Sequence, residues 1–187
     1  MKSIPEDVLE AIKRCHVTLK GPTHAPEQGD GWPNIESANV SMRKELDLFA
    51  NVRPVRIPSE DIDWTFFREN TEDIYAGLEV EAMTPDALKR QELLEDAFGW
   101  RIAEDAGIGI KTIYKTGSQR LQRAAIQYAV DRGRPRIHWV HKGNIMKFTE
   151  GAFQKWGYEL VREEFSDVAV GWDDCGGDPG DRILVQD

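Results

Sequence analysis

Cysteine is scarce in this sequence, and it has neither a long apolar run nor a surplus of positive charge. Its two cysteines, Cys15 and Cys175, lie far apart without metal-site spacing, so we expect reduced thiols and a cytoplasmic location. No apolar run could span a membrane, and the N-terminus has no signal-peptide pattern. The net charge of -9 argues against nucleic acid or an anionic membrane surface as the main partner.

The remaining composition is that of a globular protein with enough apolar material for a core. Hydrophobic residues make up 40% of the 187 residues and charged residues 30%. Apolar periodicity and capping signals predict helices over residues 5–15, 40–49, 84–98 and 118–130, and another that carries Phe153 and Leu160. Strands are predicted over residues 17–20, 74–81, 100–114 and 136–141.

The stretch from Phe66 to Gly77 combines an apolar strand-like run with a charged segment that returns to apolar character at Ile74 and Tyr75. Arg68 carries a permanent charge that suits anions, and Tyr75 is a possible proton donor. From these residues alone, two interpretations stay open. The stretch is either an active-site rim, or a strand end and a solvated acidic turn with Tyr75 packed in the core.

Two further stretches suggest a family. One is Val140-His141-Lys142-Gly143-Asn144 and its continuation to Phe153, and the other runs from Ser37 to Arg43 and on to Arg53-Pro54-Val55-Arg56. Together with residues 66–77, they resemble the β-decarboxylating dehydrogenases of 2-hydroxy acids, and most closely the isocitrate dehydrogenase branch. The resemblance covers nearly the whole chain. It implies an α/β fold, as a fragment of the isocitrate/isopropylmalate dehydrogenase-like fold.

The resemblance also implies how the chain is divided. Residues 1–48 would form part of the large, nucleotide-binding domain, and residues 49–73 and 115–187 the small α/β domain. Residues 74–114 would form a strand-helix-strand clasp, which is too small to bury a core of its own. In the family this piece interlocks with its copy, so we expect a homodimer. The alternative is an excursion packed on its own subunit.

The resemblance implies a substrate site for an isocitrate-like tricarboxylate, built from Ser37, Asn39, Arg43, Arg53 and Arg68. Three carboxylates need several cationic groups, and arginine binds carboxylate bidentately. Ser37 and Asn39 fall at a predicted helix N-terminus, which favours anions, although Ser37 could simply cap the helix. Strand alternation separates Arg53 from Arg56, and the family pattern selects Arg53.

Catalytic and cofactor roles also follow from the resemblance. Tyr75 would protonate the enolate left by decarboxylation, and Lys142 would assist proton movement at the hydroxyl, reaching into the neighbouring subunit's site. The alternative for Lys142 is a surface lysine at a strand end. His24 and Asn144 would contact NADP or NAD. His24 departs from the family's usual threonines in its loop, so a surface histidine is an equal alternative.

Two parts of the family's machinery have no counterpart in this sequence. The reaction uses a divalent cation, Mg²⁺ or Mn²⁺, but no aspartate cluster matches the metal motif, and no nucleotide-recognition loop is found. We expect both beyond Asp187, since family members are about twice as long, and we expect an internal fragment that is inactive alone. NAD and NADP stay open.

Other functions also stay open at this point. A sister dehydrogenase could act on isopropylmalate, homoisocitrate or tartrate, and a non-catalytic dimerisation fragment is a further alternative. The polar pair Ser37 and Asn39 favours isocitrate, because the isopropylmalate branch typically carries residues there that suit an alkyl group.

Overall fold

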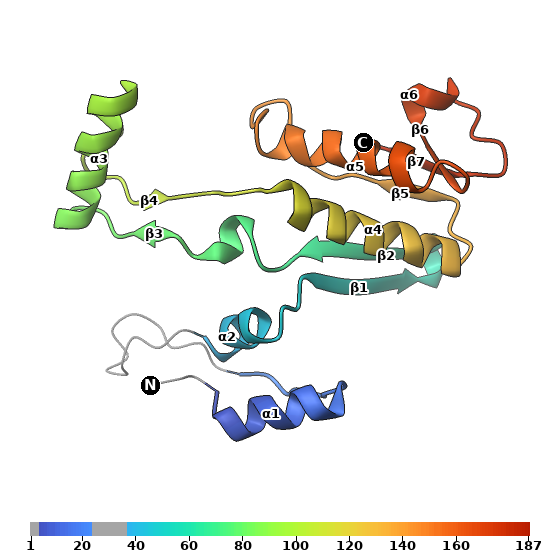
Figure 1. Cartoon of the computed structure of the whole chain (residues 1–187), viewed down its shortest axis with the longest axis horizontal. Helices are drawn as coiled ribbons and strands as arrows, with labels where there is room; N and C mark the ends of the chain where they lie inside the picture. Colours follow the sequence, from blue (N-terminus) through green and yellow to red (C-terminus); the bar gives the residue numbers. More distant parts are fainter. Residues whose placement is uncertain (1–3, 24–36) are drawn as a thin grey trace.

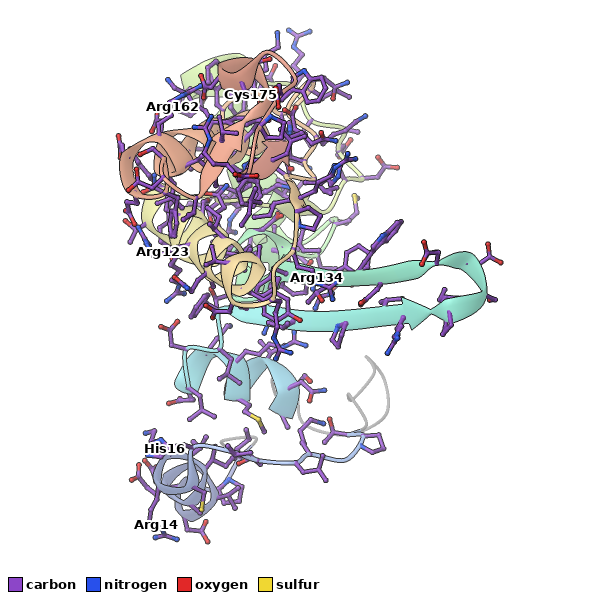
Figure 2. The ribbon with its side chains drawn as sticks, turned by 90° about the vertical axis from the view of Figure 1, so that its right-hand side faces the viewer. Arg14, His16, Arg123, Arg134, Arg162 and Cys175 are labelled. Atoms are coloured by element: carbon purple, nitrogen blue, oxygen red, sulfur yellow. The ribbon has the colours of Figure 1, made fainter. Side chains whose placement is uncertain are left out.

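A long antiparallel hairpin lies across the centre of the view in Figure 1, and in Figure 2 its closed end projects beyond the helices. The structure is a computed structural model, and it describes residues 4–23 and 37–187. Strands β1 (Ala50–Ile57) and β2 (Ile62–Glu69) form the hairpin, and the 3-10 helix η1 (Pro58–Glu60) lies between them. Asn51 pairs with Arg68, and Arg53 with Phe66. Because side chains alternate along a strand, Arg53 and Arg68 lie on the same face of the hairpin.

The main core lies where two helices meet a small parallel sheet. Helices α4 (Lys115–Asp131) and α5 (Glu150–Glu164) pack together, and the sheet has the order β5-β7-β6. Its strands are β5 (Arg136–His138), β6 (Ala169–Gly171) and β7 (Ile183–Gln186), and the short α6 (Trp172–Cys175) follows β6. Ile126, Leu160 and Val185 are fully buried in this core. The predicted α/β fold is confirmed by these elements.

Glycine is required where α5 lies closest to α4 and to the sheet. A Cβ atom added to Gly157 would lie 2.6 Å from the Gln122 side-chain nitrogen and 2.8 Å from that of Trp139. Both neighbouring side chains are buried, so neither can move aside easily. The absence of a side chain at Gly157 therefore sets how closely α5 packs.

An arm leaves the hairpin and returns to α4 (Figure 1). It contains the 3-10 helix η2 (Asp73–Ala76), the paired strands β3 (Glu79–Val80) and β4 (Ile108–Gly109), and helix α3 (Pro85–Phe98) at its far end. The Thr84 hydroxyl accepts a hydrogen bond from the Ala87 N–H, as its predicted capping role requires. Leu93, Phe98 and Trp100 are each more than 60% exposed, so the arm has no apolar core of its own.

Several strand predictions are wrong or too long. Residues 74–81 begin as the helix η2 and keep two strand residues, and residues 100–114 reduce to β4. Residues 17–20 form no strand: Val17 is 83% and Leu19 99% exposed, and no described strand pairs with them. A strand needs a partner, and the apolar pattern alone does not supply one. The strand predicted over residues 136–141 ends at His138.

The helix predictions are confirmed, with shifted ends. Helix α1 covers Glu6–Cys15, and α2 covers Ala38–Glu45 instead of residues 40–49. Asp47 takes a positive φ of 48° just after α2, and so the helix cannot continue to Phe49. Within the ranges that the structure describes, no helix is long and apolar enough to cross a membrane.

Candidate functional site

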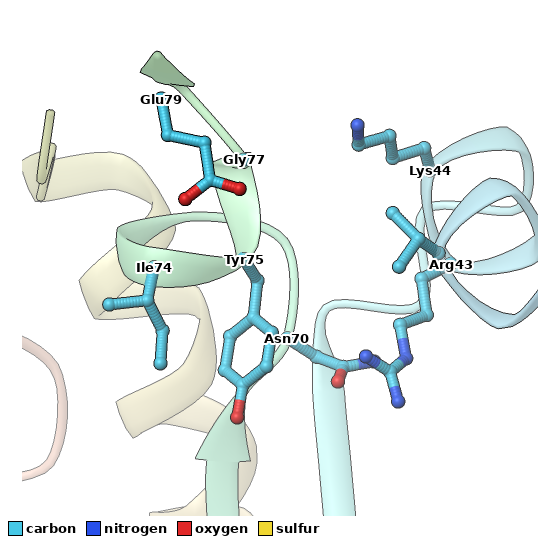
Figure 3. A pocket seen from close by; sticks show the side chains of 8 residues that line it. Arg43, Lys44, Asn70, Ile74, Tyr75, Gly77 and Glu79 are labelled. Carbon is cyan, nitrogen blue, oxygen red and sulfur yellow. The ribbon is translucent and has the colours of Figure 1, made fainter. Parts of the chain in front are cut away.

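A cavity of about 410 Å³ separates α2 from the end of β2 and from η2, and Tyr75 lines it (Figure 3). Arg43, on α2, and Asn70, the residue that follows β2, also line the cavity. In the close view, the Arg43 side chain extends from α2 toward Tyr75, and the Asn70 amide lies between the Tyr75 ring and the Arg43 guanidinium group. The cavity thus gathers a cation, an amide and a phenol from three separate elements.

Two arginines contact the ring of Tyr75. The Cζ atom of Arg68 lies 4.7 Å from the ring centroid, and that of Arg43 lies 5.8 Å from it. Such cation–π contacts are favourable, and they bring two positive charges to one side chain. Arg43 and Arg68, two of the five predicted substrate-binding residues, thus lie together at Tyr75. Tyr75 is half-buried and lines a cavity, which favours the active-site rim over the core-packed alternative.

The other predicted substrate residues lie at varying distances from this cavity. Arg53 is exposed, and its Nε donates to the Asn51 side-chain oxygen at 2.9 Å. Ser37 stands at the N-cap position of α2 but makes no capping hydrogen bond with its side chain, so simple capping does not explain it. Asn39 lies in the first turn of α2. None of these three residues is among those that line the cavity.

The backbone around Tyr75 is held in an unusual conformation. Asp73 has a φ of +62°, which is uncommon for a residue other than glycine and costs free energy. Its N–H donates to the Thr112 carbonyl at 3.0 Å, and the Tyr75 N–H donates to the Glu72 carbonyl at 3.1 Å. These bonds fix the short η2 helix, and through it the direction of the Tyr75 ring.

The carboxylates of Glu69 and Glu72 accept hydrogen bonds from the backbone around this turn. One Glu69 oxygen accepts the N–H and the hydroxyl of Thr71, both at 2.7 Å. Glu72 is only 5% exposed, and one of its oxygens accepts the Tyr114 N–H at 3.0 Å. Burial raises the pKa of Glu72 to about 7, since it disfavours the charged form, and the nearby charges of Glu69 and Asp73 act in the same direction.

A second hollow, of about 390 Å³, contains the other half of the predicted site. It is lined by residues 138–144 and by Asp187. Lys142 lies here with an exposed side chain, four residues after the end of β5, and its backbone N–H donates to a Glu150 oxygen at 2.9 Å. Asn144 lies in the same hollow with an exposed side chain. Tyr75 and Lys142 therefore line different hollows of one chain.

The loop that carries Lys142 is closely packed against the start of α5. The Gly143 N–H donates to the His141 Nδ1 atom at 3.0 Å. A Cβ atom added to Gly143 would lie 2.7 Å from that nitrogen and 2.9 Å from the Gly151 Cα atom. Glycine at position 143 is thus needed for the loop to follow its path beside α5.

The described residues support the two expected ligands unequally. Within residues 4–23 and 37–187, no group of three or more histidine, cysteine, aspartate or glutamate side chains could hold a metal ion. These residues alone do not fit a divalent-cation site. The exposed amide of Asn144 can both donate and accept hydrogen bonds, as the contact of a nicotinamide or ribose requires. His24 lies outside the described residues.

Sequence reasoning missed some residues that shape the site. Asn70 lies within residues 66–77, but no role was predicted for it. It is 6% exposed, and its amide donates to the Leu48 carbonyl at 3.0 Å. Lys111 and Glu150 contact each other across 39 positions of sequence. No local pattern points to such a contact.

Comparisons with known proteins agree with this geometry. The model of the isocitrate/isopropylmalate dehydrogenase family matches residues 1–171. A curated NADP isocitrate dehydrogenase of Archaeoglobus fulgidus is 46% identical over 98% of this chain and 47% of its own length. One of Staphylococcus epidermidis is 48% identical over 90% of this chain and 42% of its own length.

Solved structures lead to the same group of proteins. The crystal structure of isocitrate dehydrogenase from Methylococcus capsulatus matches with a TM-score of 0.68 and 29% identity. The match covers 98% of this chain and 46% of that one. The chain thus spans about half the length of the relatives that it matches.

Proposed function

This chain belongs to the isocitrate/isopropylmalate dehydrogenase family, and we propose that it supplies the substrate-binding and acid/base half of an isocitrate dehydrogenase. The proposed reaction is the oxidative decarboxylation of isocitrate to 2-oxoglutarate with NADP, or with NAD. The observation that carries the proposal is the contact of Arg43 and Arg68 with the ring of Tyr75, at a cavity that Arg43 and Tyr75 line. The names of the relatives support the choice of isocitrate and of NADP.

Binding of the substrate begins with the arginines. Each carboxylate of isocitrate can accept two parallel N–H bonds from one guanidinium group. Arg43 and Arg68 are already in place beside the cavity, and Arg53, on the same face of the hairpin as Arg68, would take a further carboxylate. Ser37 and Asn39 at the start of α2 would donate hydrogen bonds to the anion, where the helix dipole favours negative charge.

Tyr75 is proposed as the acid that ends the reaction. When NADP or NAD is bound, its nicotinamide would take the hydride from the hydroxyl-bearing carbon, and loss of the hydroxyl proton would give a β-keto acid. Breaking the bond to the β-carboxylate releases carbon dioxide, and its electron pair remains as an enolate. The phenol of Tyr75 then gives its proton to the enolate carbon. Arg43 and Arg68 beside the ring would stabilise the tyrosinate that remains.

Lys142 is proposed to move the hydroxyl proton. It lies in a different hollow from Tyr75, which suits a lysine that reaches into the site of the neighbouring subunit. The proposed assembly is a homodimer joined through the arm of residues 74–114, whose apolar side chains are exposed here. We place the assembled enzyme in the cytoplasm, in the tricarboxylic acid cycle.

Asn144 would contact NADP in the same hollow, with His24 as a second contact. Mg²⁺ or Mn²⁺, with ligands from outside this chain, is part of the proposal. The described residues show no such ligand group. The roles proposed here for Arg43, Tyr75 and Lys142 therefore do not include metal binding.

A chimera tests the proposal directly. In it, residues 1–187 replace the matching 47% of the Archaeoglobus fulgidus relative. We expect NADP reduction that depends on isocitrate, and loss of about 10²–10⁴-fold in rate when Tyr75 is changed to Phe. The matched control is Tyr128→Phe, because Tyr128 lies on α4, its hydroxyl oxygen is 3.3 Å from that of Thr65, and it lines neither hollow.

Isopropylmalate and tartrate serve as competing substrates in the same assay. Reduction of NADP with either of them, and not with isocitrate, would reject the proposed substrate. A correctly folded chimera with no activity toward any of the three would favour a non-catalytic role for the chain.

A further inference from the structure

Three charged side chains, from the segment after β4, from η2 and from α5, form one cluster. Lys111, on the segment after β4, lies 3.1 Å from an Asp73 oxygen and forms a second ion pair with Glu150, the first residue of α5. The side chains are 28%, 26% and 16% exposed, respectively, so the group is largely shielded from water. None of the three residues lines either hollow.

Each acid of this group is attached to one of the proposed catalytic segments. Asp73 begins η2, stands two residues before Tyr75 and holds the strained backbone conformation there. Glu150 uses its second oxygen to accept the backbone N–H of Lys142 at 2.9 Å. A continuous set of contacts thus runs from the Tyr75 turn, through the ammonium group of Lys111, to the loop that carries Lys142.

Charge explains why this group can fix both segments. Burial alone would lower the pKa of Lys111, but hydrogen bonds and charges of Glu150 and Asp73 outweigh burial and hold that pKa above its usual value. Burial would likewise raise the pKa of Glu150, but the Lys111 ammonium and the Lys142 N–H hold it below its usual value. Lys111 and Glu150 are therefore both charged at neutral pH.

Loss of the ammonium would release both segments. Without it, two partly shielded carboxylates would be left without their shared cation, and each would turn toward water. Glu150 would then no longer be held in place to accept the Lys142 N–H, and Asp73 would lose the partner of its side chain.

We propose that Lys111 is a positioning residue, which holds the Lys142 loop through Glu150 and the Tyr75 turn through Asp73. The catalytic consequence rests on the proposed function, but the positioning itself does not. The ion pairs of Lys111 are with Asp73 and Glu150, so it acts on Tyr75 and Lys142 through the backbone of the η2 turn and of the Lys142 loop.

Hydrogen exchange of the Lys142 amide in this 187-residue chain tests the positioning. We expect exchange about tenfold faster in Lys111→Met, because the Glu150 carboxylate that accepts the Lys142 N–H would no longer be held in place. Lys111→Arg keeps the charge and should restore most of the protection. Lys115→Met is the matched control, since Lys115 pairs with Glu159 at 2.9 Å on the exposed surface, away from the Lys142 loop.

A second variant keeps the test decisive if Lys111→Met is unstable. Glu150→Gln retains an acceptor for the Lys142 N–H but loses the ion pair, and faster exchange of that amide is expected here too. Unchanged exchange of the Lys142 amide in a folded Lys111→Met or Glu150→Gln chain would overturn the inference.

Kinetics of the chimera test the consequence for the reaction. In Lys111→Met we expect kcat to fall about tenfold to a hundredfold, as for other small misplacements of catalytic groups, with KM for isocitrate nearly unchanged. Rescue by Lys111→Arg separates positioning from general destabilisation. An active chimera whose kcat is insensitive to Lys111→Met would overturn the catalytic consequence of the positioning and leave the proposed function standing. A chimera with no activity, with fast Lys142 exchange in the variant chain, would reject the function and support the positioning.

Discussion

The guanidinium group of Arg68 lies against the ring of Tyr75, with its Cζ atom 4.7 Å from the ring centroid. The Nε atom of Arg68 is buried and has no hydrogen-bond partner among the described residues. Buried N–H groups are nearly always paired in native proteins. The Arg68 guanidinium group is thus fixed in place by an aromatic ring and has a free N–H donor, which is the arrangement that binding of an anion requires.

Replacing Arg68 should weaken anion binding specifically. We expect Arg68→Met to reduce the affinity of this chain for isocitrate about tenfold to a hundredfold, because hydrogen bonds between charged groups contribute about 1.5–3 kcal/mol. Isothermal titration calorimetry measures the change. Arg162→Met is the control, since Arg162 pairs with Asp174 on the surface. This variant should bind isocitrate as tightly as the unaltered chain does. If Arg68→Met binds isocitrate with the same affinity as the unaltered chain, Arg68 does not take part in binding it.

Local sequence signals predicted the elements whose causes are local. Thr84 followed by Pro85 predicted the start of α3, and the Thr84 hydroxyl indeed caps that helix. Strand predictions failed where long-range contacts decide. The pattern of residues 74–81 fits a strand, but the Asp73 N–H is held by the Thr112 carbonyl, and the chain turns into η2.

The candidate site shows the same division. The convergence of Arg43 and Arg68 was predicted, and it rested on the resemblance of three motifs instead of on local geometry. Arg53, predicted with them, pairs with Asn51 and is exposed. The Lys111–Glu150 contact joins residues 39 positions apart, so nothing in the neighbourhood of either residue announces it.

Glu72 should make the stability of the chain fall as the pH rises. Its pKa is about 7 in the folded chain against 4.5 for the free side chain, so the unfolded state loses this proton first. The protonated Glu72 side chain therefore makes its full contribution to the free energy of unfolding below about pH 4.5, and this contribution is lost as the pH rises toward about 7. We expect Glu72→Gln to stabilise the chain by about 1–2 kcal/mol at about pH 8, and to have little effect near pH 4.5.

Urea denaturation at the two pH values measures this difference. Glutamine keeps an oxygen that can accept the Tyr114 N–H, so the substitution removes the charge and not the hydrogen bond. Glu92→Gln on the exposed face of α3 is the control and should show no such dependence on pH. A change of equal size at both pH values would contradict the proposed titration of Glu72.

The 187-residue chain alone should not reduce NADP. The described residues contain no group of ligands for a metal ion, and the chain spans about half the length of the relatives that it matches. We expect no isocitrate-dependent absorbance at the wavelength of NADPH, with the chimera as positive control. Turnover by the purified chain, at a rate that follows its concentration, would show that these residues suffice.

Tyr75 and Lys142 should fail in different ways when each is replaced. Tyr75→Phe removes the phenolic hydroxyl and keeps the ring that Arg43 and Arg68 contact. In the chimera, protonation after decarboxylation should slow about 10²–10⁴-fold, while reduction of the β-keto acid continues. Lys142→Met should slow both the oxidation of isocitrate and the reduction of that β-keto acid, because the hydroxyl proton moves in both. Rates with the two substrates, measured separately, distinguish these patterns.

Mixing the two variants tests whether the pair is divided between subunits. Tyr75 and Lys142 line different hollows of one chain, so one site would take Tyr75 from its own subunit and Lys142 from its neighbour. In a hybrid dimer of Tyr75→Phe and Lys142→Met subunits, one site then carries both substitutions and the other carries neither. The intact site should restore part of the activity, up to about half per hybrid dimer. Because two variants that share a site within one subunit cannot complement each other, hybrids that stay inactive despite proven subunit exchange would mean that each site takes both residues from one chain.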